Sequence, residues 1–244
     1  MFMKKIIIFG RYICVVFLAI VFCVINVADA QANISLDKVI LNFVPGEKPV
    51  QNIMITNQGE KTVKVSGSVV QIQNSGQENE KEFPSKNLIL APKAFELAPG
   101  AQRQVRLVLR NFPDQQEGIY RVRFKPDTPQ ITTQEPKPGM SVKIGVVMTM
   151  GALVMVTPTV PSPKLTFERK KDVITFKNEG NVTAQLQREE FCTDGRKNCT
   201  SLDGKRIYPG MTWDHAIPES LLGKAFSQTV LINGQYSTLS FPVP

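Results

Sequence analysis

The sequence has one histidine and one tryptophan among 244 residues, and only 20% of its residues are charged. Histidine is the commonest proton shuttle near neutral pH, so its scarcity argues against an acid–base enzyme. The low charge, together with 42% hydrophobic residues, excludes a disordered polyelectrolyte. The 17 prolines and 16 glycines follow no period, which excludes a collagen. What remains is ordinary globular composition with many turns.

Long apolar runs are also scarce, and the clearest one lies near the N-terminus. Three basic residues precede the apolar run Tyr12–Val27, and the small-residue pattern Ala28-Asp29-Ala30 follows it. This order is typical of a secretory signal peptide over residues 1–30, cleaved before Gln31. The alternative is an uncleaved membrane anchor, but the run is short for a membrane span. We therefore predict export without stable membrane insertion after cleavage. Loss of three basic residues and one acidic residue lowers the net charge from +8 to +6.

Cleavage would leave two of the four cysteines, Cys192 and Cys199. In an oxidising compartment, a pair so close in sequence predicts a local disulfide. The alternative is a metal site that uses both thiols and His215. We favour the disulfide because the sequence has no Cys-x-x-Cys motif and no second histidine. The sequence accordingly predicts no metal and no cofactor.

The mature region lacks any uninterrupted stretch of a dozen residues with the helical period of 3.6. Short runs of β-branched and aromatic residues take its place, and turn signals such as Pro99-Gly100 and Asn233-Gly234 separate them. In one run Val105, Leu107 and Leu109 alternate with neighbours that include Gln104 and Arg106, as in a half-buried strand. This pattern predicts an all-β fold. The expected strands are Asn33–Phe43, Val50–Thr56, Thr62–Gln73, Gln104–Leu109, Tyr120–Phe124, Val142–Val156, Leu165–Arg169, Val173–Lys177, Thr183–Phe191, Thr229–Ile232 and Tyr236–Phe241.

A proline-rich segment divides the mature chain into two parts. Residues 157–163 contain three prolines, and such a segment cannot lie inside a sheet. We predict a first β-sandwich over residues 31–157, a linker over 158–163 and a second, smaller sandwich over 164–244. The lengths of the two parts suit sandwiches of the immunoglobulin type.

The run Val142–Val156 is longer than an ordinary strand. Its even-numbered residues form an apolar face, and it lies between a proline-containing loop over residues 127–139 and the linker. A central strand buried on both faces is one interpretation. The other is an edge strand, because a long apolar edge without a charge or a proline is a template for pairing with another chain. The apolar face consists of Val142, Ile144, Val146, Met148 and Met150.

Several motifs occur in a fixed order along the mature chain. They are Asn33–Phe43, Pro84–Leu107 with its Pro99-Gly100, Gly118-Ile119-Tyr120-Arg121, the long strand that ends before Pro158, Asn178–Asn181, Lys205–Gly210 and Thr212-Trp213. In order and spacing they resemble the periplasmic pilus-assembly chaperones of the chaperone–usher pathway. The resemblance covers about 200 residues, and the Gly-x-Tyr-Arg motif resembles the archaic or alternate branch.

This resemblance implies a periplasmic protein with two immunoglobulin-like domains in a boomerang arrangement. It implies a chaperone, not an enzyme, that holds an unassembled pilin or fimbrial subunit whose own sandwich lacks a strand. The last strand of the first domain fills the gap by donor-strand complementation, and an outer-membrane usher receives the complex. An ungapped match from Pro158 places Ile144, Val146 and Met148 at the groove-filling positions.

The sequence departs from the family at the site that anchors the subunit's terminal carboxylate. Most familiar members use an arginine on the first strand and a lysine on the last, and the ungapped match places Ile40 and Leu153 there. Arg121 is the best replacement, with Arg123 beside it, since an arginine offers a bidentate fit to a carboxylate. The alternative for Arg121 is a solvated strand charge.

Three other functions compete with this interpretation. A nucleic-acid binder is disfavoured because the basic residues are spread along the strands and export separates the protein from nucleic acid. A secreted hydrolase is disfavoured because no Gly-x-Ser-x-Gly motif exists and Asp214 and His215, as strand neighbours, point to opposite faces. A structural sandwich protein such as a pilin or an adhesin is the strongest rival, since it would share the signal peptide, the disulfide and the β-content.

Overall fold

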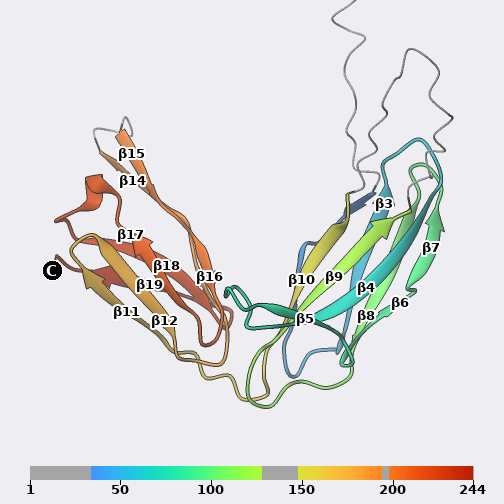
Figure 1. Cartoon of the computed structure of the whole chain (residues 1–244), viewed down its shortest axis with the longest axis horizontal. Coiled ribbons are helices and arrows are strands. Elements are labelled where there is room, and N and C mark those ends of the chain that lie inside the picture. Colours follow the sequence, from blue (N-terminus) through green and yellow to red (C-terminus); the bar gives the residue numbers. More distant parts are fainter. Residues whose placement is uncertain (1–33, 128–147, 194–197, 244) are drawn as a thin grey trace, which may run out of the picture. The chain divides into compact units, whose positions relative to one another are not determined.

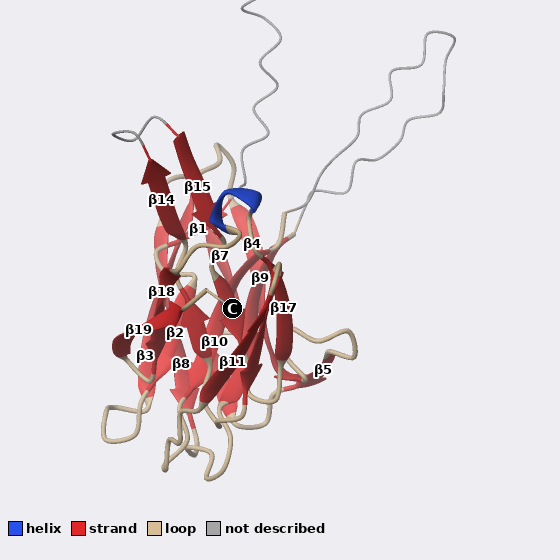
Figure 2. Cartoon of the chain, turned by 90° about the vertical axis from the view of Figure 1, so that its left-hand side faces the viewer, coloured by secondary structure: helices blue, strands red, loops and turns tan. Residues whose placement is uncertain are grey.

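The computed structural model describes residues 34–127, 148–193 and 198–243. Within these ranges the chain forms strands and turns, together with the short 3₁₀ helix η1 (Glu219–Leu221) that Figure 2 shows in blue. The described ranges contain no helix with the length and apolar character of a membrane span, and the run Tyr12–Val27 lies outside them. The all-β prediction is confirmed.

The first sandwich occupies the described residues up to Val156 and consists of two sheets (Figure 1). Its strands are β1 (Ile34–Leu36), β2 (Ile40–Phe43), β3 (Val50–Asn57), β4 (Val63–Gln73), β5 (Lys81–Pro84), β6 (Leu88–Ala91), β7 (Ala94–Leu97), β8 (Gln102–Leu109), β9 (Gly118–Pro126) and β10 (Met150–Val156). One sheet has the order β1-β3-β8-β6. The other has the order β2-β10-β9-β4-β5, and β7 also pairs with β4.

The core of the first sandwich follows from the period of two along its strands. Val105, Leu107 and Leu109 of β8 are buried, as the alternation predicts, while Arg106 between them is exposed. The buried faces of both sheets join one cluster, in which Phe124 and Val154 represent the six-stranded sheet. That sheet turns its other face outward, and the charged residues of β9 lie on this outer face.

The second sandwich has its own core. Its strands are β11 (Leu165–Lys170), β12 (Val173–Asn178), β13 (Ala184–Leu186), β14 (Glu189–Thr193), β15 (Asn198–Leu202), β16 (Lys205–Ile207), β17 (Thr212–Ala216), β18 (Phe226–Ile232) and β19 (Gln235–Phe241). They form the sheets β11-β12-β17, β16-β13-β18-β19 and β14-β15. Aromatic packing dominates this core: Phe176 stacks on Trp213 and meets Phe241 edge to face.

The hairpin predicted at Asn233-Gly234 is confirmed, since Ile232 of β18 lies opposite Gln235 of β19 across a two-residue turn. The prediction of a single strand over Asn33–Phe43 is wrong. The chain leaves the first sheet after β1 and enters the second at β2. At the bend between them the carboxylate of Asp37 accepts a hydrogen bond from Met54 N at 2.8 Å.

The single strand predicted over Thr183–Phe191 is also wrong. It divides into β13 and β14, because β13 pairs with β16 and β18 whereas β14 pairs with β15. The intervening Gln187 donates its backbone N–H to Thr229 O at 2.8 Å. A change of pairing partner therefore interrupts a run that looks continuous in sequence.

The proline-rich segment is hydrogen-bonded to both sandwiches. Thr159 N donates to Pro113 O at 2.9 Å, and Ser162 N donates to the side-chain oxygen of Asn181 at 2.6 Å. The Asn181 amide in turn donates to Val160 O at 2.9 Å and to Gln115 O at 2.8 Å. Hydrogen bonds therefore join the segment to residues of both sandwiches.

Candidate functional site

The positions expected to anchor a carboxylate lie side by side on the outer face of the six-stranded sheet. Leu153 of β10 pairs with Ile40 of β2 on one side and with Arg121 of β9 on the other. Directly paired residues point to the same face of a sheet, so the three side chains form one row. Ile40 is 44% exposed. The structure thus places Arg121 next to the two apolar residues that occupy the usual basic positions.

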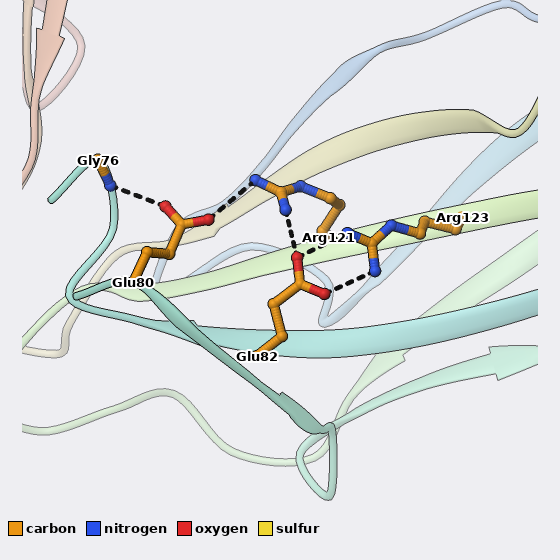
Figure 3. A network of polar contacts seen from close by, with 5 residues as sticks. All are labelled: Gly76, Glu80, Glu82, Arg121 and Arg123. Atoms are coloured by element: carbon orange, nitrogen blue, oxygen red, sulfur yellow. Dashed lines mark hydrogen bonds and ion pairs between the residues drawn. The ribbon is translucent and has the colours of Figure 1, made fainter. Parts of the chain in front are cut away.

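Arg121 and Arg123 take part in a network with two glutamates, which we call the arginine–glutamate cluster (Arg121, Arg123, Glu80 and Glu82; Figure 3). Arg123 binds both carboxylate oxygens of Glu82, at 2.7 Å through Nη1 and at 2.6 Å through Nη2. Arg121 Nη1 donates to the same carboxylate, and its Nη2 lies 3.4 Å from Glu80 Oε1. The other oxygen of Glu80 accepts a hydrogen bond from Gly76 N at 2.9 Å.

The cluster is electrically balanced and partly open to solvent. About a third of each side chain's surface is exposed, from 29% for Glu80 to 36% for Arg121. The hydrogen bond from Arg123 is the largest cause that lowers the pKa of Glu82, and the same bond raises the pKa of Arg123. Both residues are therefore charged at neutral pH, and the two guanidinium groups face two carboxylates.

A polar pocket of about 480 Å³ adjoins this face of the sheet. Ile72 of β4 and Ile119 of β9 are its buried apolar residues, and Tyr120 accepts a hydrogen bond from the Asn87 amide at its edge. Ile119 lies two residues before Arg121 and on the same face. The lining also includes Gln71, Gln73, Asn74, Ser75, Gln77, Pro113, Gln116, Glu117, Gly118, Tyr208 and Pro209.

Glu117, at the rim of this pocket, joins the two sandwiches. Its carboxylate accepts hydrogen bonds from the backbone N of Thr183, at 2.9 Å, and from the Thr183 hydroxyl. Its own N–H donates to Asn181 O at 2.9 Å. Burial raises the pKa of Glu117, and the Thr183 bonds offset only part of this effect. The Glu117 carboxylate thus bonds to the second sandwich although burial disfavours its ionised form.

The described end of the long strand contradicts a simple edge placement. Over Leu153–Val156, β10 lies between β2 and β9, so this part is an interior strand. The edge prediction is wrong here because β2 runs parallel to β10 and covers it. Over Met150–Ala152, however, the ladder with β9 continues beyond the end of the ladder with β2.

In the sequence, the predicted groove-filling residues share the even-numbered positions of the core face of β10. Ala152, Val154 and Val156 are buried, and Met150 packs against the same core. Met148 precedes the described strand and is 48% exposed. The other three predicted residues, Val142, Ile144 and Val146, lie outside the described residues.

The two acidic members of the cluster are the residues that sequence reasoning missed. Glu80 and Glu82 alternate along β5 and the turn before it, just as Arg121 and Arg123 alternate along β9. This matching period of two is a signal in the sequence. It gains meaning only once β5 and β9 are known to flank β4 in one sheet.

The second sandwich holds the predicted cysteines. Cys192 of β14 lies opposite Cys199 of β15, and Cys199 is disulfide-bonded. The His215 ring packs against Trp213 in a tilted arrangement, with ring centres 4.6 Å apart, and burial lowers the pKa of His215. In the described parts of the chain, no three acidic, histidine or cysteine side chains are grouped as a metal site would require.

Comparison with solved structures shows the shared fold. The class 5 fimbriae chaperone CfaA is 22% identical and matches with a TM-score of 0.57, over 87% of this chain and 100% of that chain. A chain of the Salmonella enterica SafA pilin–SafB chaperone complex is 16% identical, with a TM-score of 0.60 and coverages of 88% and 98%. A chain of the CsuC–CsuE chaperone–tip adhesion subunit complex of Acinetobacter baumannii is 15% identical, with a TM-score of 0.52 and coverages of 76% and 91%.

The family comparison identifies the first sandwich. The family described as pili and flagellar-assembly chaperone, PapD N-terminal domain, matches residues 33–159, slightly more than half of the chain. Comparison with curated protein sequences gives no match. The matched range contains β1 to β10, the arginine–glutamate cluster and the long strand. The chain belongs to the family of pili and flagellar-assembly chaperones.

Proposed function

We propose that the protein is a periplasmic chaperone that captures unassembled fimbrial subunits by donor-strand complementation and delivers them to an outer-membrane usher. Membership of an assembly-chaperone family supports a role in binding proteins rather than in catalysis. The observation that carries the proposal is the end of β10. At its N-terminal end the pairing with β2 stops before the pairing with β9, and in the sequence the even-numbered positions from Val142 onward are apolar.

The apolar face of the strand that ends at Val156 would contact two different partners along its length. Ala152, Val154 and Val156 bury this face in the protein's own core. Further toward the N-terminus, the same face would enter the groove of a subunit whose sandwich lacks a strand, and the backbone would pair with the exposed groove edges. Burial of four apolar side chains would contribute about 8 kcal/mol gross, before the cost of ordering both partners. These four are Val142, Ile144, Val146 and Met148. Met150, the fifth residue of the predicted face, already packs against the protein's own core.

The proposed anchor for the subunit's terminal carboxylate is Arg121, with Arg123 as the second candidate. Arg121 lies in the row of Ile40 and Leu153, where the family's usual basic residues would lie. Its guanidinium binds carboxylates within the protein, and this geometry supports a role in binding a subunit's carboxylate. A fixed anchor at one end of the donated strand would set its register in the groove.

The proposed function requires export of the protein to the periplasm. We infer cleavage of residues 1–30 and a Cys192–Cys199 bridge in the second sandwich, which the strand register favours. Such a bridge forms in an oxidising compartment and would close the β14–β15 hairpin. The proposed partners are fimbrial subunits and the usher. We also propose that the protein belongs to the archaic or alternate branch of these chaperones.

The direct test is the substitution Val146→Asp in periplasmic co-expression with a pilin-like subunit. A charge in an apolar groove is costly without a partner, so capture of the subunit should be lost while the chaperone stays folded. Val160→Asp is the matched control, because Val160 is 70% exposed in the proline-rich segment. The unsubstituted protein should yield a 1:1 complex. A Val146→Asp protein that is folded and captures the subunit normally would contradict the proposal. Self-assembly into filaments would favour a structural subunit instead.

A further inference from the structure

The proposed anchor is already occupied within the protein. Glu82 accepts hydrogen bonds from both Arg121 and Arg123, and Arg123 grips it through both Nη atoms. A subunit's terminal carboxylate would require the same groups in the same bidentate manner. An incoming carboxylate that takes the N–H groups now bound to Glu82 would have to replace Glu82 there, because two carboxylates at the same donors would repel one another at contact distance.

We propose that Glu82 is an internal competitor for the subunit's terminal carboxylate. It holds Arg121 and Arg123 in the free chaperone and is displaced when a subunit binds. This inference rests on the proposed function and deepens it. The four charges of the cluster sum to zero, so displacement of Glu82 leaves a net positive site that one incoming carboxylate neutralises again.

The location of Glu82 permits such a displacement. The short strand β5 pairs only with β4 among the described strands, and all four of its residues are exposed. Glu82 can therefore turn into solvent without breaking a packed core. Glu80 differs, because Gly76 N holds its second oxygen. Glu80 would stay in place and keep Arg121 oriented during the exchange (Figure 3).

The competition would make capture selective. A small anion or the end of a peptide must displace Glu82 before it can bind. It then forms only the contacts with Arg121 and Arg123 that Glu82 has lost, so its net gain in free energy is small. A true subunit also buries apolar side chains in its groove, and this additional free energy favours the exchange. Glu82 would thus reject weak carboxylate ligands and leave the site open to partners that bind at two places.

The test is Glu82→Gln, which removes the competing charge but keeps the size of the side chain. The probe is a short apolar peptide with a free C-terminal carboxylate, titrated while the arginine side-chain N–H signals are followed by NMR. We expect the variant to bind the peptide about tenfold more tightly than the unsubstituted protein. The amidated form of the peptide should show no such gain. Glu96→Gln is the matched control, since Glu96 pairs with Lys64 at 3.4 Å elsewhere in the same sheet.

Equal or weaker peptide binding by Glu82→Gln would overturn the inference, as would the absence of peptide binding by both proteins. An equal gain for the amidated peptide would overturn it too, because the effect would then not depend on the carboxylate. A thermal melt confirms that each variant is folded, and Glu82→Ala serves as a second variant with the same expectation. The assay uses no donated strand, so its failure is separate from a failure of the Val146→Asp experiment.

Discussion

The first and second sandwiches share a buried asparagine at the same point of the fold. In the first, Asn57 ends β3, and its amide donates to Lys61 O at 2.8 Å and to Leu97 O at 3.0 Å. Its side-chain oxygen accepts from Gly59 N at 2.9 Å, and its backbone C=O accepts from Gly100 N at 3.0 Å. Each polar group of this residue that lies in the core thus has a partner.

In the second sandwich, Asn178 ends β12 and makes the same set of bonds. Its amide donates to Val182 O at 2.9 Å and to Ile207 O at 2.8 Å, and its side-chain oxygen accepts from Gly180 N at 3.0 Å. Gly210 N donates to its backbone C=O at 2.9 Å. Gly210 and its counterpart Gly100 both follow a proline and have positive φ angles of 77° and 70°, which favour glycine.

The sandwiches differ on their surfaces. The first carries the arginine–glutamate cluster and the end of β10, whereas the ion pairs of the second join lysines to Glu168 and Glu179 at its surface. The comparison separates the motifs that both sandwiches share from the feature that the first sandwich alone carries. The repeated Asn-x-Gly and Pro-Gly corners stabilise both sandwiches, so they are structural. The cluster occurs in one sandwich, so it is the candidate for function.

The largest expected effect comes from breaking the shared corner. Asn178→Ala removes the side-chain donor to two buried C=O groups, and Asn57→Ala removes the donor to one buried and one partly buried C=O group. Each substitution should therefore lower the free energy of unfolding by about 2–4 kcal/mol. Urea denaturation of the single variants measures this loss. Nearly equal losses are expected. A large loss at one site and none at the other would show that the two corners are not equivalent.

The next effect separates the cluster from ordinary surface charge. Arg121→Ala should weaken subunit capture by about 10–100-fold, because a charge-assisted bidentate contact to the subunit's carboxylate is lost. Arg106→Ala is the control, since Arg106 is exposed on β8 in the other sheet. Titration of each variant with purified subunit measures the difference. Equal affinities for the two variants would assign Arg121 to the solvated surface.

The smallest effect concerns the contact between the sandwiches. Burial raises the folded-state pKa of Glu117, so the folded protein binds this proton more tightly than the unfolded chain does. The resulting stabilisation is present at low pH and is lost as the pH rises through the raised pKa. Glu117→Gln keeps an acceptor for Thr183 but does not titrate. We expect the stability of the unsubstituted protein relative to this variant to fall as the pH rises above the ordinary pKa of a glutamate and through the raised pKa of Glu117. A pH-independent difference in urea unfolding would contradict this.

Much of the fold was predictable because it depends on local patterns. The alternation in β8 and the Asn233-Gly234 hairpin are confirmed, since a period of two and a two-residue turn are encoded by neighbouring residues. The short strands β6 and β7 escaped prediction, because four residues on either side of a proline give too little periodicity. The divisions within Asn33–Phe43 and Thr183–Phe191 escaped because a change of pairing partner leaves no local mark.

The candidate site was predictable only in part. Arg121 followed from its motif, and its row with Ile40 and Leu153 agrees with the ungapped match. Glu82 did not follow, because its contact with Arg121 joins residues 39 positions apart and depends on the order of three strands. Pairing across a sheet is a tertiary property, and neither residue's immediate neighbours specify it.

Hydrogen–deuterium exchange tests the central claim most directly. If Val142–Met150 is donated to a subunit, its backbone amides should exchange at least about 100-fold more slowly in the purified chaperone–subunit complex than in the free chaperone. The edge strand β11 of the second sandwich is the internal control, and its exchange should be unchanged. Protection confined to Val142–Met150 is the result that donor-strand complementation predicts. Unchanged exchange of these amides in a stable complex would contradict it.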